Sequence, residues 1–202
     1  LHLSVPPAHA GAPPAASAVL SALVVKGSFF LIFRLWFGAL PALRTPAAMQ
    51  VLAALGAAAI LFGSVLALRQ QRLKLLVAYS TVAQIGYLFL MFPLVGATPL
   101  ASSAWTGGIL QAVSHALAKA AMFLSAGLLA KALGHDRIAG LAGVGRVLPM
   151  SIFAFGLGGL SLMGLPPSGG FVAKWLLLRA SIETGQWWWS LPRPPHGPML
   201  PR

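Results

Sequence analysis

The chain has 202 residues, of which 58% are apolar and only 8% are charged, and its mean hydropathy is +0.84. So few charges cannot cover a soluble globular surface, and the composition predicts an all-α, polytopic membrane protein. The formal net charge of +12 does not indicate nucleic-acid binding, because the basic residues are scattered at segment ends instead of forming one face with interleaved aromatics. The absence of cysteine excludes disulfides and thiolate chemistry.

The chain divides into three parts. Residues 1–16 are expected to form a loop before the first span, residues 17–189 a transmembrane domain, and residues 190–202 a disordered or aberrant tail rich in proline and arginine. The opening residues lack a basic region followed by an apolar core, so they do not resemble a signal peptide. Without an initiator methionine, the chain is expected to begin partway through a longer reading frame.

Five apolar runs are long enough to cross a hydrocarbon core of about 30 Å. They cover residues 17–40, 47–68, 73–95, 103–131 and 149–181. The second run contains no charge and is expected to be a packing helix. The fifth run is interrupted by GLPPSGG, residues 164–170, and a helix break is predicted at Pro166, Pro167, Gly169 and Gly170.

The distribution of basic residues predicts the orientation in the membrane. The connection at residues 69–74 carries Arg69, Arg72 and Lys74, and the connection at 131–148 is also basic. The positive-inside rule therefore places both connections in the cytoplasm. Interfacial anchors are expected at the tryptophans near segment ends: Trp36, Trp105, Trp187, Trp188 and Trp189.

Three lysines, Lys26, Lys119 and Lys174, lie inside apolar runs that contain no carboxylate. A cation in mid-bilayer costs roughly 2.5–3.5 kcal/mol on insertion scales, so such residues favour a functional reading. Lys26 lies nine residues after Ser17, about 14 Å along a helix and near mid-membrane. The structural alternative is a lysine that bonds to backbone carbonyls of a neighbouring helix and transports nothing.

The fourth run carries a polar stripe. Gln111, His115 and Lys119 follow one another at a spacing of four residues, which places them on one helix face. An imidazole can accept a proton on one nitrogen and donate from the other, so the stripe could pass protons with the help of water. The alternative is a hydrogen-bond cluster that holds helices together.

The fifth and third runs add further polar groups. Lys174 follows directly after the helix break, where exposed backbone groups are tolerated only around protein or water. Ser80, Gln84 and Tyr87 form a weaker polar face on the third run, which suits helix packing as well as a pathway. The predicted proton path is Lys26, His115, Lys119 and Lys174, with Gln111 and the third-run residues in support.

Other chemistry is not expected. The acids of the chain, Asp136 and Glu183, lie outside the apolar interiors, so no carboxylate site for a metal is predicted. Ser114 and His115 are adjacent and point in different directions on a helix, so they form no catalytic dyad. We expect no cofactor, no catalytic residue and no phosphate-binding loop.

Four stretches resemble, in order, a known family: PPAHAGAPPAASAVLSALVVKGSFFLIFR, LALRQQRLKLLVAYSTVAQIGYLFL, QAVSHALAKAAMFLSAGLL and LSLMGLPPSGGFVAKWLL. They are similar to the antiporter-like membrane subunits of respiratory NADH:quinone oxidoreductase (complex I), membrane-bound hydrogenases and Mrp-type Na⁺/H⁺ antiporters. The resemblance implies a partial fold of inverted five-helix repeats, each with a broken helix. It implies that Lys26 is a central lysine of the family, that His115 and Lys119 are a family pair, and that Lys174 is the lysine of a broken helix. The resemblance also implies that the family's glutamate and lysine pair lies upstream of Leu1.

The predicted function is proton translocation by an antiporter-like subunit, or a fragment of one, in a complex of the NADH:quinone oxidoreductase type. The alternatives are a subunit of an Mrp-type antiporter or membrane-bound hydrogenase, and a structural membrane fragment that transports nothing. The expected partners are other membrane subunits, lipid and protons, with no nucleic acid. The expected location is the inner (plasma) membrane, crossed several times, and any redox chemistry is expected on partner subunits.

Overall fold

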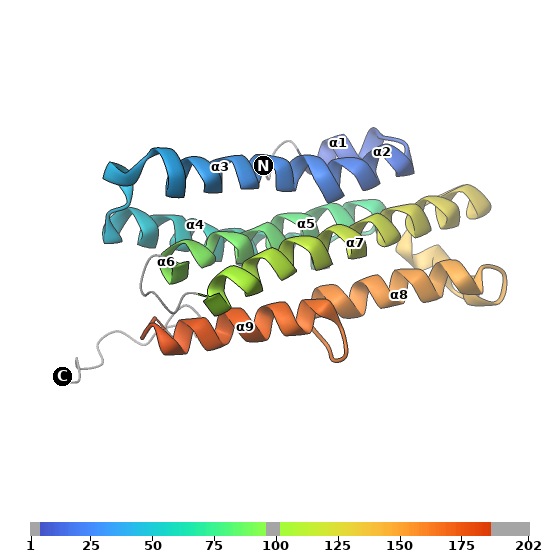
Figure 1. Ribbon diagram of the computed structural model, residues 1–202. Helices are drawn as coiled ribbons and strands as arrows, with labels where there is room; N and C mark the ends of the chain where they lie inside the picture. Colours follow the sequence, from blue (N-terminus) through green and yellow to red (C-terminus); the bar gives the residue numbers. More distant parts are fainter. Residues whose placement is uncertain (1–4, 96–101, 187–202) are drawn as a thin grey trace.

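The computed structural model describes residues 5–95 and 102–186, and in this part of the chain every regular element is helical. The tail and Trp187, Trp188 and Trp189 lie outside the described residues. The long helices lie side by side, roughly parallel or antiparallel to one common axis (Figure 1). Four apolar helical segments are long enough to cross a membrane, at Pro14–Ala39, Pro46–Leu68, Leu73–Val95 and Ser103–Leu133. The predicted all-α bundle is confirmed.

The first span is built from several consecutive helical pieces. They are α2 (Pro14–Val19), the π-helical turn η1 (Leu20–Val24), α3 (Val25–Arg34) and a second π-helical turn, η2 (Leu35–Ala39). A short 3₁₀ turn, η3 (Pro41–Leu43), leads to α4 (Pro46–Leu68). The Thr45 side chain accepts a hydrogen bond from the Ala48 amide at 3.2 Å, which satisfies one free donor at the start of α4.

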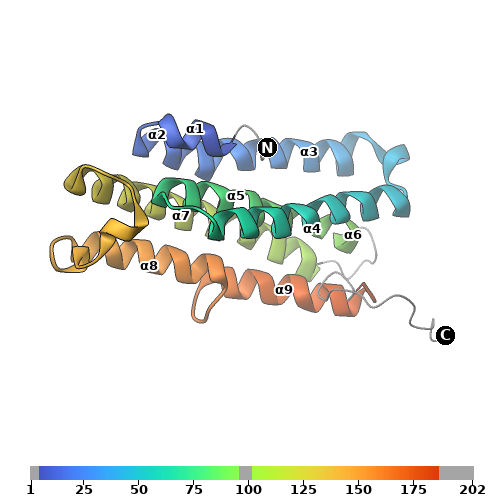
Figure 2. The ribbon, with the colours of Figure 1, turned by 180° about the vertical axis from the view of Figure 1, so that it is seen from behind.

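The N-terminal segment differs from the predicted loop. Helix α1 covers Val5–Gly11 and packs beside α5 (Leu73–Phe89). Its prolines, Pro6 and Pro7, fall in the first turn. Backbone N–H groups there have no acceptor within the helix, so the N–H that proline lacks is not missed. Figure 2 shows α1 next to α2, at the end of the bundle where α5 begins. The segment therefore belongs to the folded bundle.

The third and fourth spans form the centre. Helix α5 continues after Leu90 into α6 (Met91–Val95), and α7 (Ser102–Leu133) packs against both. At one end, an aromatic cluster joins α3, α6 and α7. In it, the rings of Phe33 and Trp105 pack edge to face, with ring centres 4.8 Å apart. At the other end, Arg72 pairs with Asp136 at 3.0 Å and connects the two basic loops. The second of these loops contains the 3₁₀ turns η4 (Ile138–Leu141) and η5 (Val144–Arg146).

The predicted fifth span is a broken helix. Helix α8 covers Pro149–Met163 and α9 covers Gly169–Glu183, so the break lies at residues 164–168. Gly164 ends α8 in the left-handed conformation, with φ of 81°. The Ser168 side chain caps α9 by accepting from the Phe171 amide at 3.2 Å. This cap corrects one detail of the prediction: Pro166 and Pro167 lie in the break, whereas Gly169 and Gly170 form the first turn of α9.

Candidate functional site

The polar stripe of α7 faces the interior of the bundle. Gln111 and His115 are each 2% exposed, and Lys119 is completely buried. The spacing of four residues aligns them as the sequence predicts. A charged side chain is rarely buried without partners, so the groups around Lys119 decide what this arrangement can do.

Lys119 is anchored on α5. Its ammonium donates to the Val77 carbonyl and to the Ser80 hydroxyl, both at 2.5 Å. The Ser80 hydroxyl in turn donates to the Val77 carbonyl at 2.9 Å. Both partners are neutral dipoles, so they can accept from either an ammonium or a neutral amine.

Ser21 places Lys26 beside the groups that surround the Val77 carbonyl, because its backbone carbonyl and its hydroxyl bond to different partners. Its ammonium donates to the carbonyl of Ser21, which lies in the π-helical turn η1. The Ser21 hydroxyl bonds to the Thr81 hydroxyl at 3.1 Å, and Thr81 donates to the Val77 carbonyl at 3.2 Å. A π-helical turn departs from the regular backbone pattern and often occurs at functional sites. Lys26 is half-buried, whereas Ser21 and Thr81 are completely buried.

The helix break supplies the acceptor for Lys174. Because α8 ends at Met163, its last carbonyls have no partner within the helix. The Leu162 carbonyl accepts from the Lys174 ammonium at 2.6 Å and from the Gln84 amide at 3.0 Å. Lys174 also lies 4.8 Å from the centre of the Tyr87 ring, in a cation–π contact.

Gln84 and Gln111 extend this second group across the bundle. The Gln111 amide donates to the Gln84 side-chain oxygen at 2.8 Å. Hydrogen bonds therefore connect Lys174 to Gln111 through the Leu162 carbonyl and Gln84. A separate set connects Lys119 to the Ser21 hydroxyl, and Lys26 donates to the backbone carbonyl of that serine. His115 lies between the two sets on the same face of α7, and neither of its ring nitrogens has a protein partner among the described residues.

The interior of the described bundle contains no carboxylate. The two acids of the chain lie at its ends, where Asp136 pairs with Arg72 at 3.0 Å and Glu183 with Arg179 at 2.6 Å. The described residues contain no group of His, Cys, Asp or Glu that could hold a metal ion. The chemistry available in this interior is therefore proton exchange among lysines, imidazole, hydroxyls and amides.

Sequence reasoning missed three interior groups: Ser21, Thr81 and His9. The hydroxyls give no periodic signal beyond that of ordinary packing residues. His9 was expected in a loop, but it is completely buried, and burial together with the charges of Lys119 and Lys26 lowers its pKa to about 4. Another histidine, His135, lies in the basic connection at residues 131–148 and is exposed, and His196 lies outside the described residues.

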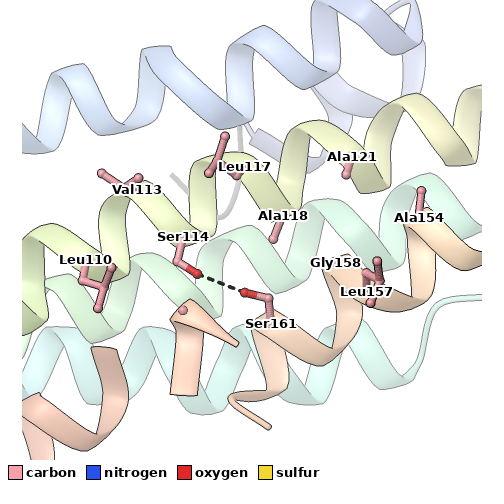
Figure 3. A pocket seen from close by; sticks show the side chains of 11 residues that line it. Leu110, Val113, Ser114, Leu117, Ala118, Ala121, Ala154, Leu157, Gly158 and Ser161 are labelled. Atoms are coloured by element: carbon pink, nitrogen blue, oxygen red, sulfur yellow. Dashed lines mark hydrogen bonds between the residues drawn. The ribbon is translucent and has the colours of Figure 1, made fainter. Parts of the chain in front are cut away.

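A separate groove of about 450 Å³ runs between α7, α8 and the start of α9 (Figure 3). The hydroxyls of Ser114 and Ser161 bond across it at 3.0 Å. The remaining lining is apolar or glycine: Leu110, Val113, Leu117, Ala118, Ala121, Ala154, Leu157, Gly158 and Gly169. Because no titratable side chain lines it, the groove does not contain the predicted proton path.

Comparisons with known proteins agree with this architecture. NADH-quinone oxidoreductase subunit N of Desulforudis audaxviator is 35% identical over 188 residues, covering 93% of this chain and 36% of that protein. F(420)H(2) dehydrogenase subunit M of Methanosarcina mazei is 35% identical over 178 residues, covering 88% of this chain and 34% of that protein. The chain thus spans about a third of the length of these relatives.

Solved structures show the same fold. A chain of the Mrp complex from Dietzia sp. superposes with a TM-score of 0.82 and 30% identity, over 92% of this chain and 33% of that one. A chain of the archaeal membrane-bound sulfane sulfur reductase superposes with a TM-score of 0.79 and 25% identity, over 92% and 37%. The family model described as "NADH:quinone oxidoreductase/Mrp antiporter, TM" matches residues 1–192. The chain is therefore a multi-pass plasma-membrane protein that belongs to the NADH:quinone oxidoreductase/Mrp antiporter family.

Proposed function

We propose that this chain is the proton-translocating part of an antiporter-like subunit in a multi-subunit membrane complex. The observation that carries the proposal is the series of buried and half-buried polar groups from Lys26 through Lys119 and His115 to Lys174. Its groups lie on the first, third and fourth spans and on α9, inside an otherwise apolar bundle. Ionisable groups are costly in such a place, and they commonly mark ion pathways. The relatives named above are subunits of such complexes, which supports other membrane subunits as partners.

Protons would move in short steps along this series. An ammonium gives a proton to a neighbouring acceptor and becomes a neutral amine, which a later proton restores. His115 would bridge Lys119 and Gln111, since imidazole accepts on one nitrogen and donates from the other. Its ring nitrogens lack protein partners, and bound water would complete the connection on both sides.

Replacement of Lys119 tests this role. In the full-length protein assembled with its partners, Lys119→Ala should abolish most proton transport into proteoliposomes, because the titrating group in the middle of the series is lost. Lys131→Ala is the matched control, since Lys131 is an exposed residue in the last turn of the same helix. Native gels report assembly. Normal transport in Lys119→Ala would remove Lys119 from the path, and loss of assembly would favour the structural alternative.

A cation/proton antiporter is a second candidate, favoured by the similarity to a chain of the Mrp complex. In that case the same proton path would be coupled to Na⁺ movement. This segment should nevertheless bind no Na⁺ of its own, since lysine and imidazole offer no hard anionic oxygen. Proton transport that requires Na⁺ in the assembled complex would favour the antiporter, whereas transport driven by an electron donor without Na⁺ would favour the oxidoreductase type.

A further inference from the structure

His9 occupies a defined position inside the bundle. Its imidazole ring is completely buried and stacks on Phe123 of α7, with ring centres 4.5 Å apart and an interplanar angle of 21°. The His9 carbonyl accepts a hydrogen bond from the Ser17 hydroxyl at 3.4 Å, which ties α1 to α2. The backbone and the ring are therefore held from two sides.

The ring nitrogens of His9 have no protein partner among the described residues. A buried polar group without a hydrogen bond lowers the stability of the folded protein by about 1–3 kcal/mol. If the ring only filled space, phenylalanine would therefore give a more stable protein. Buried polar atoms of this kind are commonly satisfied by internal water. Two such nitrogens on one ring provide both an acceptor and a donor for water.

The position of His9 relates it to Lys119. Phe123 follows Lys119 by four residues, about 6 Å along the axis of α7 toward its end, and the His9 ring stacks on Phe123. The charges of Lys119 and Lys26 reach the ring and help burial to lower the pKa of His9. When Lys119 loses its proton, this repulsion falls and His9 accepts a proton more easily.

Helix α1, which carries His9, leads to α2 near the end of the bundle where α5 begins and α7 finishes (Figure 1). This end is basic, because Arg69 follows α4, Arg72 precedes α5 and Lys131 lies in the last turn of α7. Lys74 donates to the Ala12 carbonyl at 3.5 Å, at the junction of α1 and α2. The sequence predicts that this end faces the cytoplasm. His9 therefore lies between a buried lysine and the basic end.

We propose that His9 is a further proton-relay residue, which passes protons between Lys119 and the basic end through water bound to its two ring nitrogens. The inference rests on the proposed function of the chain. In each step the unprotonated nitrogen takes a proton from a hydronium ion or an ammonium group, and imidazolium forms. Release of the proton from the opposite nitrogen to water on the other side restores neutral imidazole. The ring then returns to its first tautomer by exchange with the same water.

Replacement by phenylalanine separates this role from packing. His9→Phe keeps an aromatic ring against Phe123 and removes two unsatisfied nitrogens, so a packing role predicts normal assembly and normal transport. A relay role predicts normal assembly with proton transport reduced at least tenfold in the assembled full-length complex. His135→Phe serves as the control, since His135 is an exposed histidine of a loop. Its transport should be unchanged.

A second variant guards against a failure to fold. His9→Gln is polar and flexible but cannot titrate, and it too should assemble and lose transport. Normal transport in an assembled His9 variant would overturn the proposal, and loss of assembly in both variants would overturn it in favour of packing. Lys119→Ala, measured beside them, tests the proposed function separately. Transport lost in Lys119→Ala but kept in His9→Phe would leave the proposed function standing without His9, whereas transport kept in both would overturn both proposals.

Discussion

Each interior lysine donates to a backbone carbonyl, and the three acceptors are the carbonyls of Ser21, Val77 and Leu162. A carboxylate partner would favour the ammonium form strongly, because opposite charges stabilise each other at short distance. A carbonyl accepts from an amine as well as from an ammonium. Neutral partners therefore let each lysine lose a proton without breaking an ion pair, which suits a group that must give up its proton and regain it.

The amide pair formed by Gln84 and Gln111 gives a prediction at this scale. Gln84→Leu removes the acceptor of the Gln111 amide and should lower the free energy of unfolding by about 1–3 kcal/mol. It should also slow proton transport roughly tenfold, equivalent to about 1.4 kcal/mol in the barrier, because the link toward Lys174 is cut. Thermal unfolding in detergent and transport in proteoliposomes measure the two effects.

A second glutamine pair provides the matched control. Gln50 donates to Gln186 at 2.9 Å, outside the polar series. Gln50→Leu should reduce stability without slowing proton transport. Equal transport losses in both variants would indicate that stability, and not the hydrogen-bonded series, governs the rate.

At the scale of the elements, glycines set the distance between α4 and α5. A Cβ atom on Gly86 would collide with the Gly56 carbonyl and with the Ile60 side chain. A Cβ atom on Gly63 would lie 2.6 Å from the Ala83 amide nitrogen. Small residues allow membrane helices to approach closely and gain van der Waals contact. Helix α4, which the sequence predicts to be a packing helix, thus supports the helix that carries Val77, Thr81 and Gln84.

Gly86→Ala should therefore lower the thermal stability of the assembled protein, since backbone atoms on α4 must move to admit the methyl group. The expected loss is about 1–3 kcal/mol, as for other overpacked sites. Gly156→Ala in α8 is the control, because a Cβ there meets nothing within 4 Å. Differential scanning calorimetry on both variants should show a lower unfolding temperature only for Gly86→Ala. An unchanged transition temperature in Gly86→Ala would contradict close packing of α4 on α5.

For the whole molecule, the distribution of charge gives the bundle two different ends. Arg69, Arg72 and Lys131 lie at the end where α5 begins and α7 finishes, as both ribbon views show (Figures 1 and 2). The opposite end, where α4 begins and α9 finishes (Figure 1), carries Arg44 and the Arg179–Glu183 pair. The bias toward one end predicts that it faces the cytoplasm.

Labelling of single cysteines tests this orientation, because the chain has no cysteine of its own. A membrane-impermeant maleimide should label Gln71→Cys and Ala139→Cys only in inside-out vesicles. It should label Ala42→Cys, at the other end, only in right-side-out vesicles. The reverse pattern would contradict this orientation. It would place the basic end, and the proposed relay through His9, on the outer side of the membrane.

The sequence by itself determined the membrane class, the approximate spans, the helix break and the inward polar stripe of Gln111, His115 and Lys119. These properties depend on the length of apolar runs, on proline and glycine, and on helical periodicity, all of which are local. Only the tertiary structure decided which carbonyl each lysine reaches. It also decided that Ser21 and Thr81 connect Lys26 to Lys119, and that α1 buries His9. Those contacts join residues far apart in the chain, and they depend on how the helices pack and rotate against one another, which no local pattern specifies.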